Sequence, residues 1–85
     1  MTESHTHSTH PKTAARLKRA KGHLASVIAM IEDGRPCAEI AQQLHAVEKA
    51  VTQAKRTLIH DHIDHCLDPG NRADAEDFRA ITRYL

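Results

Sequence analysis

The segment at residues 60–66, which reads HDHIDHC, concentrates side chains that bind metal ions. It supplies three imidazoles, two carboxylates and one thiol within seven residues. The whole chain has two cysteines and eight histidines, a composition more typical of a metal site than of a disulfide framework. Thiolate and imidazole ligands suit Cu(I), Zn(II), Ni(II) or Co(II) rather than Mg(II) or Ca(II). The sequence therefore predicts a metal site.

One long helix must position these groups. Neither Gly nor Pro interrupts residues 37–68, and apolar positions alternate between spacings of three and four residues, as in a coiled-coil seam. The seam positions are Cys37, Ile40, Leu44, Val47, Val51, Ala54 and Leu58. Such a helix has about 30 residues and a length of roughly 45 Å. That is too long for a compact monomer, so we expect a second chain to cover part of the seam.

Positions around this helix separate two of the clustered groups from the others. With Cys37 as origin and about 100° per residue, His62 falls at about −20° and Cys66 at about +20°. His60 lies roughly 140° away, and His65 is about 80° off the seam. The geometry therefore favours His62 and Cys66 as ligands and leaves His60 and His65 as bystanders.

Cys37 shares this face but is too far along the axis to join the other two ligands within one chain. About 25 helical residues separate Cys37 from His62, or roughly 37 Å, whereas metal–ligand bonds are about 2.0–2.3 Å long. Two antiparallel helices with Val51 near a two-fold axis would place Cys37 of one chain opposite His62 and Cys66 of the other. A symmetric dimer would then carry two equivalent sites.

The remaining chain divides into a tail and one domain. Residues 1–11 are polar and predict a flexible, His-rich tail. Its His5, His7 or His10 could supply a fourth ligand, or the tail could scavenge metal. Residues 12–85 predict a single helical domain.

Apolar residues at helical spacing predict a first helix over 12–32, with Gly34 as its left-handed cap. Residues 68–71 break the long helix, and a short third helix is expected over 73–84. The third helix is expected to bury Phe78, Ile81 and Leu85. The fold class is therefore all-α, with a three-helix protomer around a long central helix.

Basic residues are concentrated in the first helix although the net charge is only +1. One ten-residue window without an acid contains Lys12, Arg16, Lys18, Arg19 and Lys21. A local basic segment indicates a nucleic-acid partner better than net charge does. Lys49 is interpreted as part of a solvated face, and His23 and His45 as structural or surface residues. The absence of an apolar run near 18 residues and of a signal peptide predicts a cytoplasmic protein with no membrane contact.

Four motifs carry a resemblance to a known family. They are RLKRAKGHL at residues 16–24, a cysteine that opens the long helix, QQLHAVEKAV at residues 42–51, and HDHIDHC. The chain resembles the CsoR/RcnR/FrmR family of small helical transcriptional repressors over nearly its whole length, and is most similar to the nickel- and cobalt-responsive DmeR-type members. The resemblance implies an antiparallel dimer that pairs into a tetramer.

The resemblance also implies a ligand set. Cys37, His62 and Cys66 match the family's three main ligand positions, and His5 matches the N-terminal ligand position of its nickel and cobalt sensors. Copper sensors in this family place a Tyr before the first Cys and a Glu in the last helix. Here Pro36 precedes that Cys, and the last six residues contain no Glu. We therefore expect Ni(II) or Co(II) as effector, with Cu(I) as the alternative and Zn(II) also compatible.

A formaldehyde-responsive repressor and a non-regulatory metal chaperone each account for part of the sequence. Formaldehyde sensors of the family typically carry an N-terminal Pro and lack the second thiol, whereas this chain has Thr2 and Cys66. A chaperone would explain the His-rich tail but not the basic helix. A metal-dependent hydrolase needs a cleft that a short helical chain does not offer, so we expect neither an enzyme nor a small organic substrate.

The expected partner is double-stranded operator DNA. Arg16 and Arg19 match DNA-contacting positions of the family, and Lys18 and Lys21 belong to the same basic helix. By resemblance the operator is GC-rich and is read largely through its shape. The expected activity is repression by the metal-free protein, with release of the operator and derepression of a metal efflux gene when metal binds.

Overall fold

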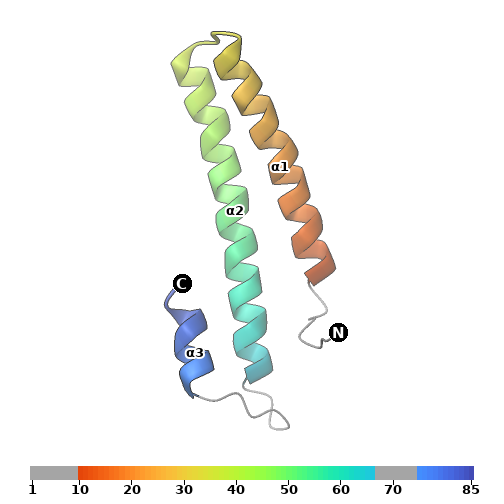
Figure 1. Ribbon diagram of the computed structural model, residues 1–85, viewed down its shortest axis with the longest axis vertical. Coiled ribbons are helices and arrows are strands. Elements are labelled where there is room, and N and C mark those ends of the chain that lie inside the picture. Colours follow the sequence, from red (N-terminus) through yellow and green to blue (C-terminus); the bar gives the residue numbers. More distant parts are fainter. Residues whose placement is uncertain (1–9, 67–74) are drawn as a thin grey trace.

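The computed structural model describes residues 10–66 and 75–85, except for the side chains of residues 65, 66 and 75–77 (Figure 1). These residues form three helices, α1 (His10–Glu32), α2 (Cys37–Cys66) and α3 (Ala75–Thr82), and contain no strand. The all-α prediction with a long central helix is confirmed. None of the described helices is both long and apolar enough to cross a membrane.

The start of α1 differs from its predicted position. The helix begins at His10, so the last two residues assigned to the tail, His10 and Pro11, belong to α1 instead. Proline is tolerated in the first turn of a helix, because the N–H that it lacks would have no partner within the helix. The helical region therefore begins two residues earlier than the apolar pattern indicated.

A tight turn ends α1 where the sequence predicts it. Gly34 has φ 70°, the left-handed conformation that a residue without Cβ adopts most easily. The N–H of Arg35 donates to the carbonyl of Met30 at 3.0 Å, and the N–H of Gly34 donates to that of Ile31 at 3.1 Å. This pair of bonds is a Schellman motif, which satisfies carbonyl groups in the last turn of the helix.

The start of α2 follows directly. The carbonyl of Pro36 accepts from the N–H groups of Glu39 and Ile40 at 3.0 and 3.1 Å, so Pro36 caps the helix from just outside its first residue, Cys37. Arg35 Nε donates to Glu39 Oε1 at 3.0 Å across the same turn. Four residues, 33–36, therefore connect α1 to α2 with little freedom.

α1 and α2 form an antiparallel hairpin (Figure 1). Residues at intervals of seven face the partner helix, because a seven-residue repeat keeps one stripe of side chains in contact along two helices whose axes are nearly aligned. The buried stripe is Thr13, Ala20 and Val27 on α1, with Val47 and Ala54 on α2. Most of these side chains are small. The core of the protomer is correspondingly modest, and among the side chains that the structure describes only Val27 and Ile59 are large and buried almost completely.

The predicted seam of α2 divides into two rows. Val47 and Ala54 are buried, whereas Leu44, Val51 and Leu58 are 45%, 45% and 39% exposed. α1 has a similar exposed apolar set, which consists of Leu17, Leu24, Ile28 and Ile31. The radius of gyration is 17.0 Å, compared with about 12 Å for a compact domain of this length. One chain therefore forms an elongated hairpin that leaves much of its apolar surface in contact with solvent.

α3 contacts α2 and, within the described residues, makes no contact with α1. Figure 1 shows it beside the C-terminal half of α2, with α1 on the other side of that helix. Of the three side chains predicted to be buried here, Ile81 is half-buried, but Phe78 is 39% and Leu85 64% exposed. The prediction is wrong for these two residues in a single chain, because Phe78 lies on a helix of eight residues that packs on one neighbour, and Leu85 lies beyond the end of that helix.

Candidate functional site

The two parts of the predicted metal site lie at opposite ends of α2. Cys37 is the first residue of the helix, at the tip of the hairpin, and Cys66 is its last. His62 lies one turn before that last residue and is half-buried. A continuous helix separates Cys37 from His62 by roughly 37 Å. One chain therefore does not bring these donors together.

Among the side chains that the structure describes, no three of His, Cys, Asp or Glu lie close enough together to hold a metal ion. The side chain of Cys66 is outside this description, as are those of His5, His7 and His65. The assignment of Cys37, His62, Cys66 and His5 as metal ligands stays a prediction, and so does the role of His65 as a bystander.

The donors that are described fit a site completed by another chain. Cys37 is a free thiol and is exposed, so packing within the hairpin does not use it. His60 is exposed while His62 is half-buried, so the two histidines differ in their surroundings. A thiol at the end of a helix is accessible to a metal ion that bridges two molecules, and sulfur is the ligand type that Cu(I) and Zn(II) favour.

A second candidate site is a groove of about 440 Å³ between α1 and α2. We call it the basic groove, and its lining residues are Arg16, Arg19, Ala20 and His23 from α1 and Lys49, Ala50 and Gln53 from α2. The two alanines leave room between the longer side chains. No acidic residue is among these seven, so the groove concentrates positive charge between the two helices. Arginine and lysine in such an arrangement bind phosphate groups.

Only two of the four predicted DNA-binding residues line the basic groove. Arg16 and Arg19 line it, whereas Lys18 and Lys21 do not. At about 100° per residue, these two lysines point roughly 140° and 160° away from His23 around α1. The structure thus joins the two arginines with Lys49 of α2, which the sequence placed on a solvated face.

One hydrogen bond ties the two walls of the groove together. His23 Nε2 lies 2.7 Å from Gln43 Oε1, and the contact is partly buried. The sequence alone assigned no function to His23. The available signal was its spacing, since it follows Arg19 by four residues and Arg16 by seven, which places all three on one face of a helix.

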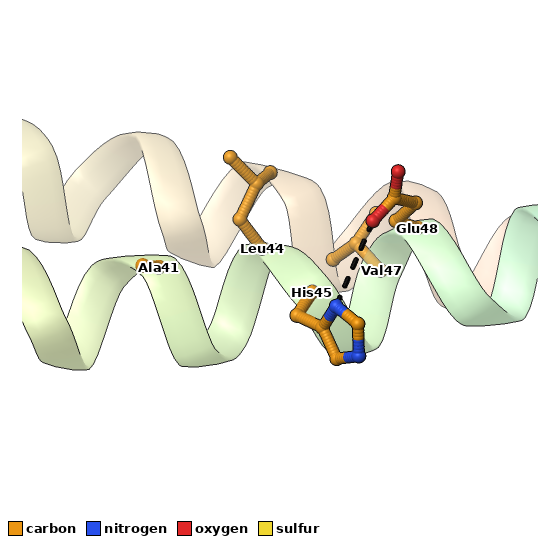
Figure 2. A pocket seen from close by; sticks show the side chains of 5 residues that line it. All are labelled: Ala41, Leu44, His45, Val47 and Glu48. Carbon is orange, nitrogen blue, oxygen red and sulfur yellow. Dashed lines mark ion pairs between the residues drawn. The ribbon is translucent and has the colours of Figure 1, made fainter.

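A third feature is a shallow hollow of about 470 Å³ on α2, lined by Ala41, Leu44, His45, Val47 and Glu48 (Figure 2). His45 Nδ1 lies 3.7 Å from Glu48 Oε1, and both side chains are largely exposed. Figure 2 shows Leu44 extending to the opposite side of α2 from the His45 ring. The interpretation of His45 as a surface residue is confirmed.

Comparison with known proteins identifies the family to which the chain belongs. Residues 9–85 match the family described as metal-sensitive transcriptional repressor. Because this match covers nearly the whole chain, the chain belongs to that family, which consists of regulators rather than enzymes. No solved structure matches the chain significantly.

Several curated relatives are named for copper sensing. The chain is 40% identical over 60 residues to the copper-sensing transcriptional repressor CsoR of Mycobacterium ulcerans, covering 68% of this chain and 51% of that protein. It is 36% identical over 71 residues to CsoR of Bacillus subtilis, covering 82% and 68%. It is 31% identical over 80 residues to the copper-sensing transcriptional repressor RicR of Mycobacterium tuberculosis, covering 85% and 83%. The chain spans about half the length of the first of these relatives.

Proposed function

We propose that this protein is a metal-responsive transcriptional repressor that binds operator DNA in its metal-free form and releases it when metal binds. The observation that carries the proposal is the basic groove, in a chain of this family that also has potential metal donors at both ends of one helix. The groove offers cationic side chains that would bind DNA phosphates, and the separated donors would let a metal ion bridge two chains.

DNA binding rests on the groove's three permanent cations, Arg16, Arg19 and Lys49. Each phosphate that they neutralise releases condensed counterions, which favours binding and makes it steeply salt-dependent. Phosphate contacts of this kind position a protein on the duplex without reading its bases. A GC-rich operator read through shape is consistent with a chain that has few aromatic side chains for base stacking.

The exposed row of α2 supports an antiparallel dimer. Leu44 and Leu58 each lie seven residues from Val51, so the row is symmetric about Val51. A two-fold axis at Val51 would pair Leu44 of one chain with Leu58 of the other and bury apolar side chains that are now exposed. The same axis places Cys37 opposite position 65, which lies between His62 and Cys66. The tetramer is inferred from the family resemblance.

Metal binding would join the chains through Cys37 from one protomer and His62 and Cys66 from the other. The metal supplies a bond between the hairpin tip of one chain and the C-terminal end of α2 in its partner. The residues before α1 lead directly into the helix that carries Arg16 and Arg19, so recruitment of His5 would change the position of those arginines. A ligand shifts an equilibrium only through such a difference in contacts between two states.

Cu(I) is the effector that the relatives favour. The curated relatives described above are named copper-sensing repressors. Two thiolates and one imidazole also form a soft donor set that suits Cu(I). On these grounds Cu(I) is better supported than the nickel or cobalt effector expected from the sequence.

Ni(II) or Co(II) is the second candidate, and it rests on the sequence. Pro36 precedes Cys37, at the position where copper sensors of the family carry a Tyr. A fourth nitrogen donor from His5 would favour Ni(II), Co(II) or Zn(II) over a three-coordinate Cu(I) site.

A mobility-shift experiment with DNA from the protein's own promoter region tests the proposal. The metal-free protein should retard this DNA, and one of Cu(I), Ni(II), Co(II) or Zn(II) should release it at the lowest free concentration. Formaldehyde added to metal-free protein tests whether the repressor responds to formaldehyde instead. A protein that binds metal tightly but retards no promoter DNA would be a metal chaperone, and the proposed function would be wrong.

A further inference from the structure

His23 is the one titratable residue of the basic groove that the proposed function does not use. It lies on the same wall as Arg16 and Arg19, with Lys49 on the opposite wall. Its ring is held by Gln43 of α2, 2.7 Å away. His23 is half-buried and lines the groove together with the three cations Arg16, Arg19 and Lys49.

The bond to Gln43 determines which ring nitrogen carries hydrogen. An amide oxygen only accepts, so His23 Nε2 must donate to Gln43 Oε1. In the neutral ring, Nδ1 then has a lone pair and has no hydrogen to donate to a phosphate oxygen. A second proton turns Nδ1 into a donor and gives the ring a positive charge. The protonated ring is therefore the form that binds phosphate.

The charges around His23 are supplied by both helices. Arg16 and Arg19 from α1 and Lys49 from α2 are cationic, while Gln43 and Gln53 are neutral. A DNA phosphate seated among them would bring negative charge next to the ring. Phosphate and proton would then favour each other's binding, because coupling between two ligands is reciprocal.

The acidic residue one turn before Gln43 on α2 is engaged elsewhere. Glu39 accepts a hydrogen bond from Arg35 across the helix connection. None of the residues that line the groove is acidic, so no carboxylate there competes with DNA for the protonated ring.

We propose that His23 is a phosphate-binding residue of the basic groove, oriented by Gln43, and that it takes up a proton when DNA binds. This inference rests on the proposed DNA binding and adds a regulation to it. The metal-free repressor holds DNA more tightly as pH falls through the range in which histidine titrates.

Fluorescence anisotropy with a promoter duplex and chelator-treated protein tests the inference at constant ionic strength. The affinity of the wild-type protein should rise as the pH falls from about 8 to about 6. His23→Gln still offers an amide donor to Gln43 but does not titrate. The rise in its DNA affinity over the same pH range should therefore be roughly three- to tenfold smaller than the rise for the wild type. Calorimetry in buffers of different ionisation enthalpy should show that the variant takes up fewer protons when it binds DNA.

Two further variants separate orientation from packing. Gln43→Leu removes the acceptor for His23 Nε2 and should reduce the pH dependence. His45→Gln is the matched control, because His45 is exposed on α2 outside the groove, and its profile should follow the wild type. Circular dichroism and light scattering on each variant establish that helicity and assembly are preserved.

The outcomes separate this inference from the function on which it rests. If the wild type and His23→Gln show the same pH profile while both bind DNA, His23 is not the coupled group and the inference alone is overturned. If the wild type binds no promoter DNA at any pH, the repressor proposal is overturned, and the role of His23 with it.

Discussion

The two functional surfaces of the α1–α2 hairpin differ in how much of each is present in one chain. The basic groove is assembled within the protomer, since Arg16 and Lys49 come from two helices that pack directly on each other. The predicted metal donors Cys37 and His62 are separated by most of the length of α2. Their site would be complete only in a dimer. Metal sensing should therefore depend on assembly, while the local phosphate contacts should not.

The largest effect is expected from a charge introduced at Val51, the centre of the exposed row of α2, because it should prevent the dimer from forming. In Val51→Glu, the two-fold axis would bring two carboxylates together in an apolar interface, where unpaired charge is strongly disfavoured. The dimer dissociation constant should rise by more than about 100-fold, equivalent to roughly 2.7 kcal/mol. Metal affinity should fall with it. Light scattering and metal competition titrations on the same samples measure both effects.

Gln42→Glu is the control for this variant. Gln42 is exposed on α2, nine residues before Val51 and therefore about half a turn around the helix from it. It adds the same charge outside the proposed interface and should leave the dimer intact. A dimeric Val51→Glu protein with unchanged metal affinity would show that α2 does not pair about Val51.

The next largest effect should come from Cys37→Ala. Removal of one of three metal ligands should lower metal affinity by more than about 100-fold, since loss of a supporting residue alone costs 10- to 100-fold. DNA should still bind, because the basic groove is at a distance from the hairpin tip. Metal should no longer release it. Competition with chromogenic chelators and mobility shifts with and without metal measure the two properties separately.

His60→Ala is the paired control, because His60 is exposed and predicted to be a bystander. Its metal affinity should stay close to that of the wild type. Equal losses in both variants would show that His60 also contributes to metal binding, and a Cys37→Ala protein that still responds to metal would remove Cys37 from the site.

A smaller effect distinguishes the two faces of α1. Arg16→Ala should weaken binding to every duplex sequence and reduce the slope of log affinity against log salt by about 1, as expected for one lost phosphate contact. Lys18→Ala, on the opposite face, should change both quantities much less. Affinities measured by anisotropy across a salt series test the pair. A larger loss in Lys18→Ala would place the DNA on the other side of α1.

The smallest effect concerns the turn that connects α1 to α2. Gly34 has φ 70°, and Ala in the left-handed region costs roughly 1–2 kcal/mol. Gly34→Ala should therefore lower the Tm by several degrees at a fixed protein concentration. Gly22→Ala, in the middle of α1 with no atom within 4 Å of the added Cβ, should instead stabilise the helix by about 0.5–1 kcal/mol. Thermal unfolding followed by circular dichroism compares the two.

The sequence predicted the helices well because their ends are set by local chemistry. Gly34 terminates α1 wherever the rest of the chain lies, and the uninterrupted repeat from Cys37 specifies a long α2. The sequence could not indicate which of the two rows of the α2 seam faces α1. Leu44 and Val47 both occupy the predicted seam, and only packing of α2 against α1 buries Val47 and leaves Leu44 exposed.

The sequence also could not predict which residues would line the basic groove together. Family resemblance identified Arg16 and Arg19, but spacing within one helix does not reveal that Lys49 lies across from them. That contact depends on the register between two helices, which also brings His23 to Gln43. Lys18 and Lys21 were grouped with the arginines because proximity in sequence does not distinguish opposite faces of a helix.

The four-residue connection at 33–36 gives this register a strict dependence on chain length. A residue inserted there and absorbed into α2 would advance the helix by about 1.5 Å and rotate it by about 100°. Lys49 would then leave the groove, and Val47 would no longer face α1. Relatives that keep both surfaces should therefore vary in the amino acids of this turn but conserve the number of residues in it, so an insertion or deletion there would mark a protein with a different arrangement of α1 and α2.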